Sequence, residues 1–358
     1  MQIKKRRKSP SIFGFTFILT ILGIIALADI SAPQGQSFFS DPFYFVKQQA
    51  IWVGLGLVAF IVASYTPYSL WKKISPFLFI LNVILLIMVL IPGLGTKFLG
   101  ARRWLIFGPI SIQPSELSKL TLGLFLAYLL DKKTRILFAV IPIALVAALI
   151  MFEPDLGTTL VVLGIGFSQL FISGIALTAF LAAIAVGIGL VTPLVLLSSY
   201  RRERLMTFIN GITDPLGTSY HIRQILFALG SGGLLGVGLG NSRQKFLFLP
   251  ESSTDSIFAI IAEEIGYLGA GLVIILFVIY IYKLIWVAGR APDTFSKIFV
   301  IGIAGWIMTQ TFLNIGSMVA AVPLTGVPLP FFSYGGSAIT ALLFSLGIVN
   351  NIARNSPI

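Results

Sequence analysis

Long apolar stretches separated by short polar segments run along nearly the whole chain. A helix that crosses a membrane needs about 20 predominantly apolar residues. Ten stretches approach or reach that length, and because the fourth and sixth are short, nine or eleven crossings stay open. The pattern predicts an all-α polytopic membrane protein with a single integral membrane domain over residues 1–358. The expected spans are 12–29, 48–65, 74–92, 115–130, 136–152, 157–173, 175–198, 257–282, 295–320 and 337–353.

The composition supports this prediction and excludes several kinds of site. Hydrophobic residues make up 57% of the chain and charged residues 11%, whereas an ordinary soluble domain carries about 25% charged residues. The absence of cysteine excludes disulfides and thiolate metal sites. His221 is the single histidine, so a multi-histidine metal site is also excluded. The net charge of +12 indicates loop orientation and contact with anionic membrane lipids, not nucleic acid binding.

Positive charge is distributed unevenly between the two sides of the expected spans. With the N-terminus in the cytoplasm, the cytoplasmic segments hold Lys4, Lys5, Arg6, Arg7, Lys8, Lys72, Lys73, Lys132, Lys133, Arg135, Lys283, Arg290, Lys297 and Arg354. The short outer loops then hold only Lys47, Lys97, Arg102 and Arg103. Because cytoplasmic loops carry an excess of Lys and Arg, we expect both termini in the cytoplasm.

Polar residues concentrate in one long outer loop, 199–256, between the seventh and eighth expected spans. Long loops in compact proteins are usually functional or disordered. This one contains apolar stretches and the glycine-rich run 230–240, which lacks the Gly-Lys-Ser/Thr ending of a phosphate loop. We expect the run to be a flexible or re-entrant segment packed against helices. The proline-rich block 323–337 is expected to be an outer loop, either purely structural or a wall of a binding site.

Charged residues near the spans need an explanation, because each costs about 2.5–3.5 kcal/mol at the bilayer centre. Glu116 and Lys119 lie three residues apart and so share one face of a helix. They form either a local ion pair or a polar element that faces a cavity, with Lys119 available to an anion. Glu263 and Glu264 need partners or a water-filled cavity, and we expect a structural network for both.

Two aspartates lie where outer segments meet spans. Asp255 precedes the eighth expected span, where it fits a helix N-cap, a carboxylate held at the outer surface, or both. Asp155, in the turn Glu153-Pro154-Asp155, fits a helix cap or a partner for an outer arginine, and we favour a structural role for it.

Eight basic residues are expected on the outer side. Arginine forks suit phosphate oxygens, so these residues either contact lipid headgroups or bind a substrate that carries phosphate or diphosphate. They are Arg102, Arg103, Arg201, Arg202, Arg204, Arg223, Arg243 and Lys245.

Seven motifs follow one another between residues 100 and 337. They are GARRWL (100–105), QPSELSK (113–119), EPDLGT (153–158), DPLG (214–217), the glycine-rich run with NSRQK (230–245), LPESSTD (249–255) and TGVPLPFFSYGGS (325–337). In their order and spacing they resemble the SEDS family (shape, elongation, division and sporulation), which polymerises bacterial peptidoglycan. The compact length resembles the elongation branch (RodA-like) more than the division branch.

Two positions depart from the family pattern. Family members often have His-Thr-Asp-Phe where this chain has Ser253-Thr254-Asp255-Ser256, and Gln-Pro-Asp where it has Glu153-Pro154-Asp155. Both aspartates are kept. The first departure indicates that the neighbouring histidine is not an obligatory proton relay.

The resemblance implies a glycosyltransferase that polymerises lipid II, an undecaprenyl-diphosphate-linked disaccharide-pentapeptide, into β-1,4-linked strands for cell elongation and rod shape. We expect an inverting reaction with Asp255 as general base. Supporting roles are expected for Asp155, Glu263 and Glu264. A divalent cation, Mg²⁺ or Mn²⁺, could be shared with the substrate diphosphate, although the sequence offers no metal cluster. The expected substrate-binding residues are Arg102, Arg103, Glu116, Lys119, Arg243, Lys245 and Ser333.

The resemblance also implies a class B penicillin-binding protein as partner and a location in the bacterial cytoplasmic membrane, with the active site on the outer face. Two alternatives remain. A lipid II flippase would line a path through the membrane with charges, and Glu263 and Glu264 would fit such a path. A non-catalytic scaffold for a cell-wall synthase would not need Asp255 beyond helix capping.

Overall fold

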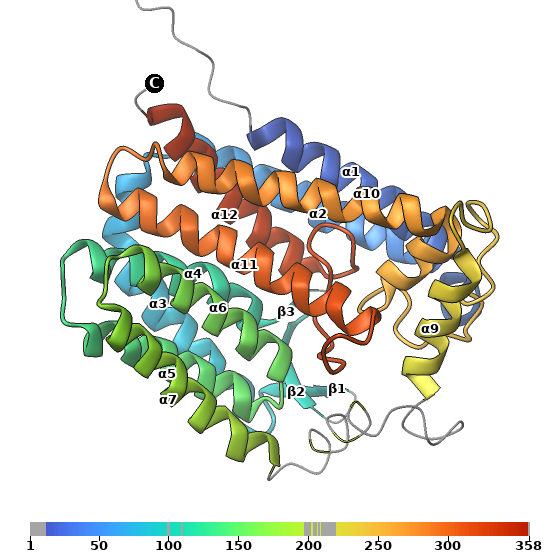
Figure 1. Ribbon diagram of the computed structural model, residues 1–358, viewed down its shortest axis with the longest axis horizontal. Helices are drawn as coiled ribbons and strands as arrows, with labels where there is room; N and C mark the ends of the chain where they lie inside the picture. The colour runs from blue at the N-terminus through green and yellow to red at the C-terminus, as the bar shows by residue number, and fades with distance from the viewer. Residues whose placement is uncertain are drawn as a thin grey trace, which may run out of the picture.

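The computed structural model describes residues 12–98, 101–108, 110–196, 202, 206, 208 and 220–356. Most of these residues are helical, and Figure 1 shows the helices packed side by side with a small sheet among them. In this view α9 lies at the right and the sheet near the lower middle, both away from the C-terminus at upper left. The helices are α1 Ile12–Phe39, α2 Tyr44–Tyr65, α3 Tyr68–Leu90, α4 Pro114–Asp131, α5 Ile136–Phe152, α6 Leu156–Ile172, α7 Leu177–Leu196, α9 Tyr220–Gly232, α10 Ile257–Ala288, α11 Thr294–Met318 and α12 Gly336–Asn355.

The helices coincide with the apolar stretches of the sequence. Each of the ten expected spans overlaps one helix, and α9 lies inside the expected long outer loop. Among the described residues, six helices are long and apolar enough to cross a membrane, namely α1, α2, α3, α10, α11 and α12. The apolar parts of α5 and α6 are shorter, and α4 carries Glu116 and Lys119. The observed architecture is therefore a mostly helical bundle with candidate membrane spans, while ten crossings stay a prediction.

A three-stranded antiparallel sheet corrects the all-α prediction. Its strands are β1 Gly95–Phe98, β2 Ala101–Phe107 and β3 Ile110–Ile112, in the order β1-β2-β3. They occupy the segment between α3 and α4, where the sequence suggested only a loop. Strands β1 and β3 have only four and three residues, and β2, with the sequence ARRWLIF, does not alternate apolar and polar residues.

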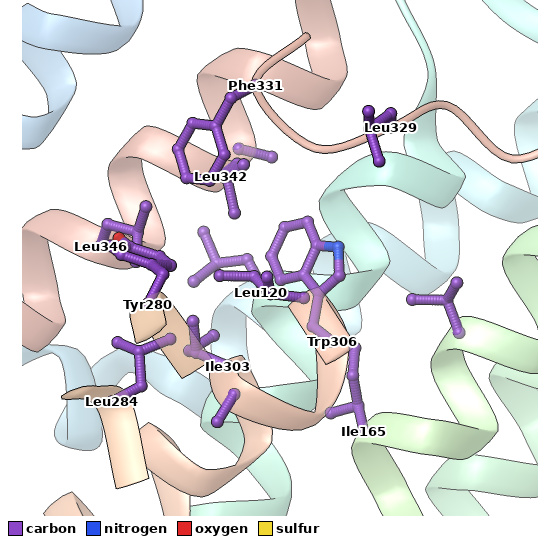
Figure 2. Packing of buried hydrophobic residues seen from close by; sticks show 14 of the residues in the cluster. Leu120, Ile165, Tyr280, Leu284, Ile303, Trp306, Leu329, Phe331, Leu342 and Leu346 are labelled. Carbon is purple, nitrogen blue, oxygen red and sulfur yellow. The ribbon is translucent and has the colours of Figure 1, made fainter. Parts of the chain in front are cut away.

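The core of the bundle forms around α11 and α12. In these two helices 72% of the most apolar stretch is buried, against 22–33% in α1, α2, α3 and α10, so the latter helices lie at the periphery. Figure 2 shows side chains of α4, α6, α10, α11, α12 and the proline-rich loop meeting in this core. The labelled ones include Leu120, Ile165, Tyr280, Trp306, Phe331 and Leu342.

Helix α10 is broken at Gly266, whose backbone is not helical (φ 70°, ψ −174°). In an unbroken helix the carbonyls of Glu263 and Glu264 would accept hydrogen bonds from the amides four residues later. The break separates these two carbonyls from the amides that would donate to them. Unpaired backbone groups are not tolerated in an apolar environment, so another segment must supply the missing partners.

The glycine-rich run 230–240 supplies them. Four backbone hydrogen bonds cross between the run and the break, two in each direction. They join Val237 N to Glu263 O (3.0 Å), Gly238 N to Glu264 O (3.0 Å), Tyr267 N to Gly233 O (2.9 Å) and Leu268 N to Leu234 O (3.2 Å). The run thus packs against a helix, as expected, and replaces part of the hydrogen-bonding ladder of α10.

This close backbone contact explains the glycines. A Cβ atom on Gly236 would lie 2.1 Å from the carbonyl oxygen of Glu264, and one on Gly266 would lie 2.3 Å from the amide nitrogen of Gly236. Both glycines also have positive φ, at 84° and 70°. An L-residue at either position would suffer both the clash and the strained backbone.

We predict that Gly266→Ala lowers the free energy of unfolding by at least about 1–3 kcal/mol, the usual cost of such backbone strain. Thermal unfolding of the purified protein in detergent would measure this effect. Gly271→Ala is the matched control, because it lies in the same helix and its Cβ would meet no atom within 4 Å. Equal unfolding temperatures for the two variants would contradict the proposed role of the break.

Candidate functional site

Asp255 lies in the turn that precedes α10 and is half-buried. The helix begins at Ile257, and its N-cap residue is Ser256. Asp255 therefore lies one residue outside the cap position, which corrects the interpretation of Asp255 as the N-cap.

Helix α11 and the proline-rich loop hold the turn from one side. The Nδ2 group of Asn314 donates to the carbonyl oxygens of Asp255 (2.7 Å) and Val327 (2.8 Å). The Oγ of Ser333, in the same loop, donates to the carbonyl oxygen of Thr254. These contacts tie the backbone beside Asp255 to the core of the bundle.

Helix α1 holds the same turn from another side. The Nε2 group of Gln34 donates to Ser252 Oγ (2.7 Å), and its Oε1 accepts from Ser253 Oγ (2.8 Å). Three elements far apart in sequence thus converge on four consecutive residues. A carboxylate on such a supported turn has the fixed position that proton transfer requires.

Ser333 organises the loop. Besides donating to Thr254, its Oγ accepts a hydrogen bond from Leu329 N (2.8 Å). The side chain is 6% exposed. These contacts give Ser333 a structural role, and direct contact between Ser333 and a substrate stays a prediction.

Glu116 and Lys119 form a buried ion pair with an Oε1–Nζ distance of 2.7 Å. Lys119 Nζ also donates to Gln310 Oε1 (3.1 Å) and lies 5.2 Å from the centre of the Trp306 ring. The lysine side chain is only 1% exposed. In this conformation its ammonium group is enclosed by protein.

A small cavity borders this pair. It is lined by Glu116, Trp306 and Gln310, together with the proline-rich loop and the start of α12, and its volume is about 10 Å³. Glu116 Oε2 has no hydrogen-bond partner among the described residues. The volume is about that of one water molecule, so a diphosphate does not fit. Glu116 and Lys119 thus form the local ion pair, the first of the two expected arrangements, and Lys119 is not available to an anion in this conformation.

Gln310 connects this pair to the loop that supports Asp255. Its Nε2 donates to the carbonyl oxygen of Pro328 (2.7 Å). Asn314, one turn later on α11, donates to the preceding carbonyl of the loop, that of Val327. Neither residue was among those expected from the sequence. Their signal was a pair of amide side chains four residues apart in an otherwise apolar span, where each needs a partner.

Lys245 pairs with acids of two different helices. Its Nζ lies 2.8 Å from Asp29 Oδ1 of α1 and 2.9 Å from Glu264 Oε1 of α10, and its side chain is 4% exposed. The two carboxylates balance the charge of the buried Lys245 ammonium group, so its position needs no bound substrate to explain it. Asp29 was also missed, although a lone acid in the first expected span signalled a buried partner.

Glu263 completes this network, and the expectation of a structural role for Glu263 and Glu264 agrees with the geometry. Glu263 Oε1 accepts from Ser231 Oγ (3.3 Å) and Arg243 N (3.2 Å), and its Oε2 accepts from Ser242 Oγ. Both glutamates are buried. The network therefore joins α1, the glycine-rich run and the first half of α10.

Arg103 of β2 holds the turn between α5 and α6. Its guanidinium donates to the carbonyl oxygens of Glu153 (3.1 Å) and Pro154 (2.6 Å) and lies 3.9 Å from Asp155 Oδ2. Asp155 caps α6 by accepting from Thr158 N (3.0 Å). Asp155 thus fills both roles expected from the sequence, a helix cap and a partner for an outer arginine.

Glu153 is fully buried, and neither carboxyl oxygen has a hydrogen-bond partner among the described residues. Burial raises the pKa of Glu153 to about 9, and the negative charge of Asp155 contributes. The side chain is therefore neutral at pH 7. A neutral glutamic acid is close in shape and polarity to the glutamine of the family pattern.

Among the described side chains, those of the remaining cations of the expected outer loops take no part in these ion-pair and hydrogen-bond clusters. Arg102 is half-buried and Arg243 exposed, and neither side chain has an ion pair with a described residue. Arg223 stacks on Phe227 of its own helix, 5.7 Å from the ring centre. Arg202 is exposed. Arg201 and Arg204 lie outside the described residues.

Metal ligands do not cluster in the described part of the chain. No three side chains of His, Cys, Asp or Glu there lie close enough together to hold an ion.

We predict that Lys245→Met lowers the free energy of unfolding by about 3–5 kcal/mol, because the buried Glu264 and the half-buried Asp29 lose their cation. Thermal unfolding in detergent measures the effect. Adding Glu264→Gln to Lys245→Met should restore part of the loss, and Arg243→Met, on an exposed side chain, should cost little. A Lys245→Met variant with native stability but weakened substrate binding would instead support direct contact with substrate.

We predict that Glu153→Gln weakens the pH dependence of stability. Between its ordinary pKa of 4.5 and about 9, folded Glu153 keeps a proton that the unfolded chain has lost. The free energy of unfolding therefore falls as pH rises through this window. The unfolding temperature of Glu153→Gln should fall less than that of the native protein over this range. Glu251→Gln, at an exposed carboxylate, is the control, and identical curves for all three proteins would refute the assignment.

Comparison with known families places this geometry in context. Residues 10–357 match the family profile described as "Cell cycle protein", which covers FtsW, RodA and SpoVE. Stage V sporulation protein E of Bacillus subtilis is 37% identical over 99% of this chain and 100% of its own length. The probable peptidoglycan glycosyltransferase FtsW of Pasteurella multocida is also 37% identical, over 94% of this chain and 88% of its own length.

Solved structures show the same fold. One chain, from work on structural coordination of polymerization and crosslinking by a peptidoglycan synthase complex, aligns with a TM-score of 0.79 at 28% identity. The alignment covers 96% of this chain and 97% of that one. Rod shape determining protein RodA of Thermus thermophilus aligns with a TM-score of 0.72 at 27% identity, over 96% of each chain.

Proposed function

The chain belongs to the cell cycle protein family of FtsW, RodA and SpoVE, and on this premise we propose that it is a peptidoglycan glycosyltransferase that polymerises lipid II with Asp255 as general base. The relatives named as probable peptidoglycan glycosyltransferases support the reaction. The observation that carries the assignment of Asp255 is its supported but half-buried position at the start of α10.

The other acids near the outer ends of the helices have different surroundings. Glu116, Glu153 and Asp155 are at most 5% exposed, and Glu263 and Glu264 are engaged in the Lys245 network. Glu251 is exposed and accepts a hydrogen bond from Thr254 Oγ1 (2.8 Å). A general base must be both fixed and accessible to the acceptor hydroxyl, and Asp255 combines these properties.

The proposed step is a direct displacement. The Asp255 carboxylate accepts the proton of the acceptor sugar hydroxyl while that oxygen attacks the anomeric carbon of the donor. The diphosphate leaves from the opposite face, so an α-linked donor gives a β-linked product. Arg102 and Arg243, which have no ion pair with a described residue, are the best candidates to stabilise the departing diphosphate. Lys119, Lys245 and Arg103 are already held by protein groups.

We further propose a class B penicillin-binding protein as partner, because a structure of high similarity belongs to a peptidoglycan synthase complex. The proposed location is the bacterial cytoplasmic membrane, with cytoplasmic termini and Asp255 on the outer face. The elongation role stays a prediction, since the sequence relatives are SpoVE and FtsW proteins whereas RodA is the similar solved structure.

The contacts of Glu263 and Glu264, the two residues that favoured the flippase alternative, count against it. Glu263 and Glu264 have partners in the network around Lys245, within the first half of α10 and the glycine-rich run. A path for a charged headgroup would require such acids to face an open route.

We predict that Asp255→Asn reduces polymerisation of labelled lipid II by at least about 10²-fold, the lower end of what a general base contributes. The assay would use the full chain with its cognate partner, with transpeptidation blocked and glycan products sized on a gel. The unfolding temperature would show that the variant is folded. Asp41→Asn, an outer-loop carboxylate paired with exposed Lys47, is the matched control and should retain native activity.

Equal product from native protein and Asp255→Asn would remove Asp255 as the base and direct attention to Glu251. Absence of product from both, with lipid II crossing vesicle membranes, would establish the flippase. Absence of both polymerisation and crossing would leave the scaffold.

A further inference from the structure

The single histidine of the chain reaches the residue that follows Asp255. His221 lies in the first turn of α9, and its Nε2 is 2.8 Å from Ser256 Oγ. Ser256 is fully buried, whereas His221 is partly exposed. The bond joins two residues 35 positions apart and brings the helix of the long outer loop to the start of α10.

The other polar groups of Ser256 are already used. Its amide donates to the carbonyl oxygen of Glu251 (3.0 Å), and its carbonyl accepts from the amide of Ala259 (3.1 Å). Its side chain makes no cap hydrogen bond to α10. Among the described residues, His221 is the hydrogen-bond partner of Ser256 Oγ, so loss of the imidazole would leave a buried hydroxyl unpaired.

This bond completes the support of the backbone around Asp255. Asn314 holds the carbonyl of Asp255 from α11, and His221 holds the next side chain from α9. The position of the Asp255 side chain relative to α10 depends on the backbone torsions at Asp255 and Ser256, which join it to the helix. Supports on both sides restrict those torsions, and a displacement near 1 Å at a reacting group can lower a rate about 10²-fold.

We propose that His221 is a positioning residue that, through Ser256, sets the position of the Asp255 carboxylate relative to the acceptor hydroxyl. The inference rests on the proposed function of Asp255 and extends it by giving α9 a role in catalysis. Because His221 acts through the protein and not through the substrate, its loss should lower kcat and leave KM nearly unchanged.

The test is a double-mutant cycle in the lipid II polymerisation assay with the full chain and its partner. His221→Leu and Ser256→Ala should each lower kcat about 10-fold, with KM changed by less than about twofold. The double variant should be no slower than either single variant, because both remove the same bond. His221→Gln, which keeps a polar nitrogen at similar reach, should restore most of the lost activity.

Tyr220→Phe is the matched control. Tyr220 precedes His221 on α9, and its hydroxyl donates to the carbonyl oxygen of Phe248 (2.9 Å) at the other end of the same turn. Removing that hydroxyl weakens the docking of α9 without touching Ser256, so kcat should stay within about twofold of native. Should His221→Leu fail to fold, Ser256→Ala and His221→Gln still decide the question.

Additive losses in the cycle, a rise in KM, or a His221→Gln variant as slow as His221→Leu would overturn the positioning role. The two proposals fail differently. If Asp255→Asn polymerises normally, the assignment of the base fails whatever His221 does. If Asp255→Asn is inactive while His221→Leu and Ser256→Ala match the native protein, only the inference about His221 falls.

Discussion

The region around α9 and the start of α10 depends on the need to pair the backbone groups that the break in α10 exposes. At Gly266 the helix loses its internal hydrogen bonds, and in an apolar surrounding each unpaired group costs several kcal/mol. The glycine-rich run meets this need and is therefore held against α10. The segments on either side of the run are then fixed as well, α9 before it and the turn with Asp255 after it. The position of the candidate base thus follows from a requirement of the backbone.

Buried charge and accessible charge have separate roles in this structure. Lys119 and Lys245 looked like substrate-binding residues, yet each is nearly fully buried and paired with carboxylates. Burial of an ion is tolerated only with a close partner, so these lysines link helices. The groups that we propose for the chemistry are those that keep some exposure and a supported backbone, above all Asp255.

The proline-rich loop links the buried charged groups to the turn that carries Asp255. Its irregular backbone leaves carbonyls that a helix or sheet would satisfy, and α11 supplies donors through Gln310 and Asn314. The same loop contacts the turn of Asp255 through Ser333 and borders the cavity beside Glu116. A change at the Glu116–Lys119 pair can therefore reach Asp255 through a short series of hydrogen bonds.

The sequence by itself determined the features that are local. Runs of apolar residues predicted the helices, and the order of the motifs indicated the family. The three-residue spacing of Glu116 and Lys119 predicted their ion pair, because neighbours on one helix face meet whatever the rest of the chain does. The cap at Asp155 followed from its place before a helix.

Only the tertiary structure decided the rest. Strands β1 and β3 are too short for a recognisable period and β2 does not alternate. Nothing in the sequence sets Gly266 apart from Gly269 and Gly271 as the point where α10 breaks. Asp29 meets Lys245 across 216 positions of sequence, and His221 meets Ser256 across 35. The local sequence pattern shows which residues prefer burial, and whether they lie in a helix or in a strand. The choice of partner for a buried polar group depends on which distant segments pack together, and that is a property of the whole fold.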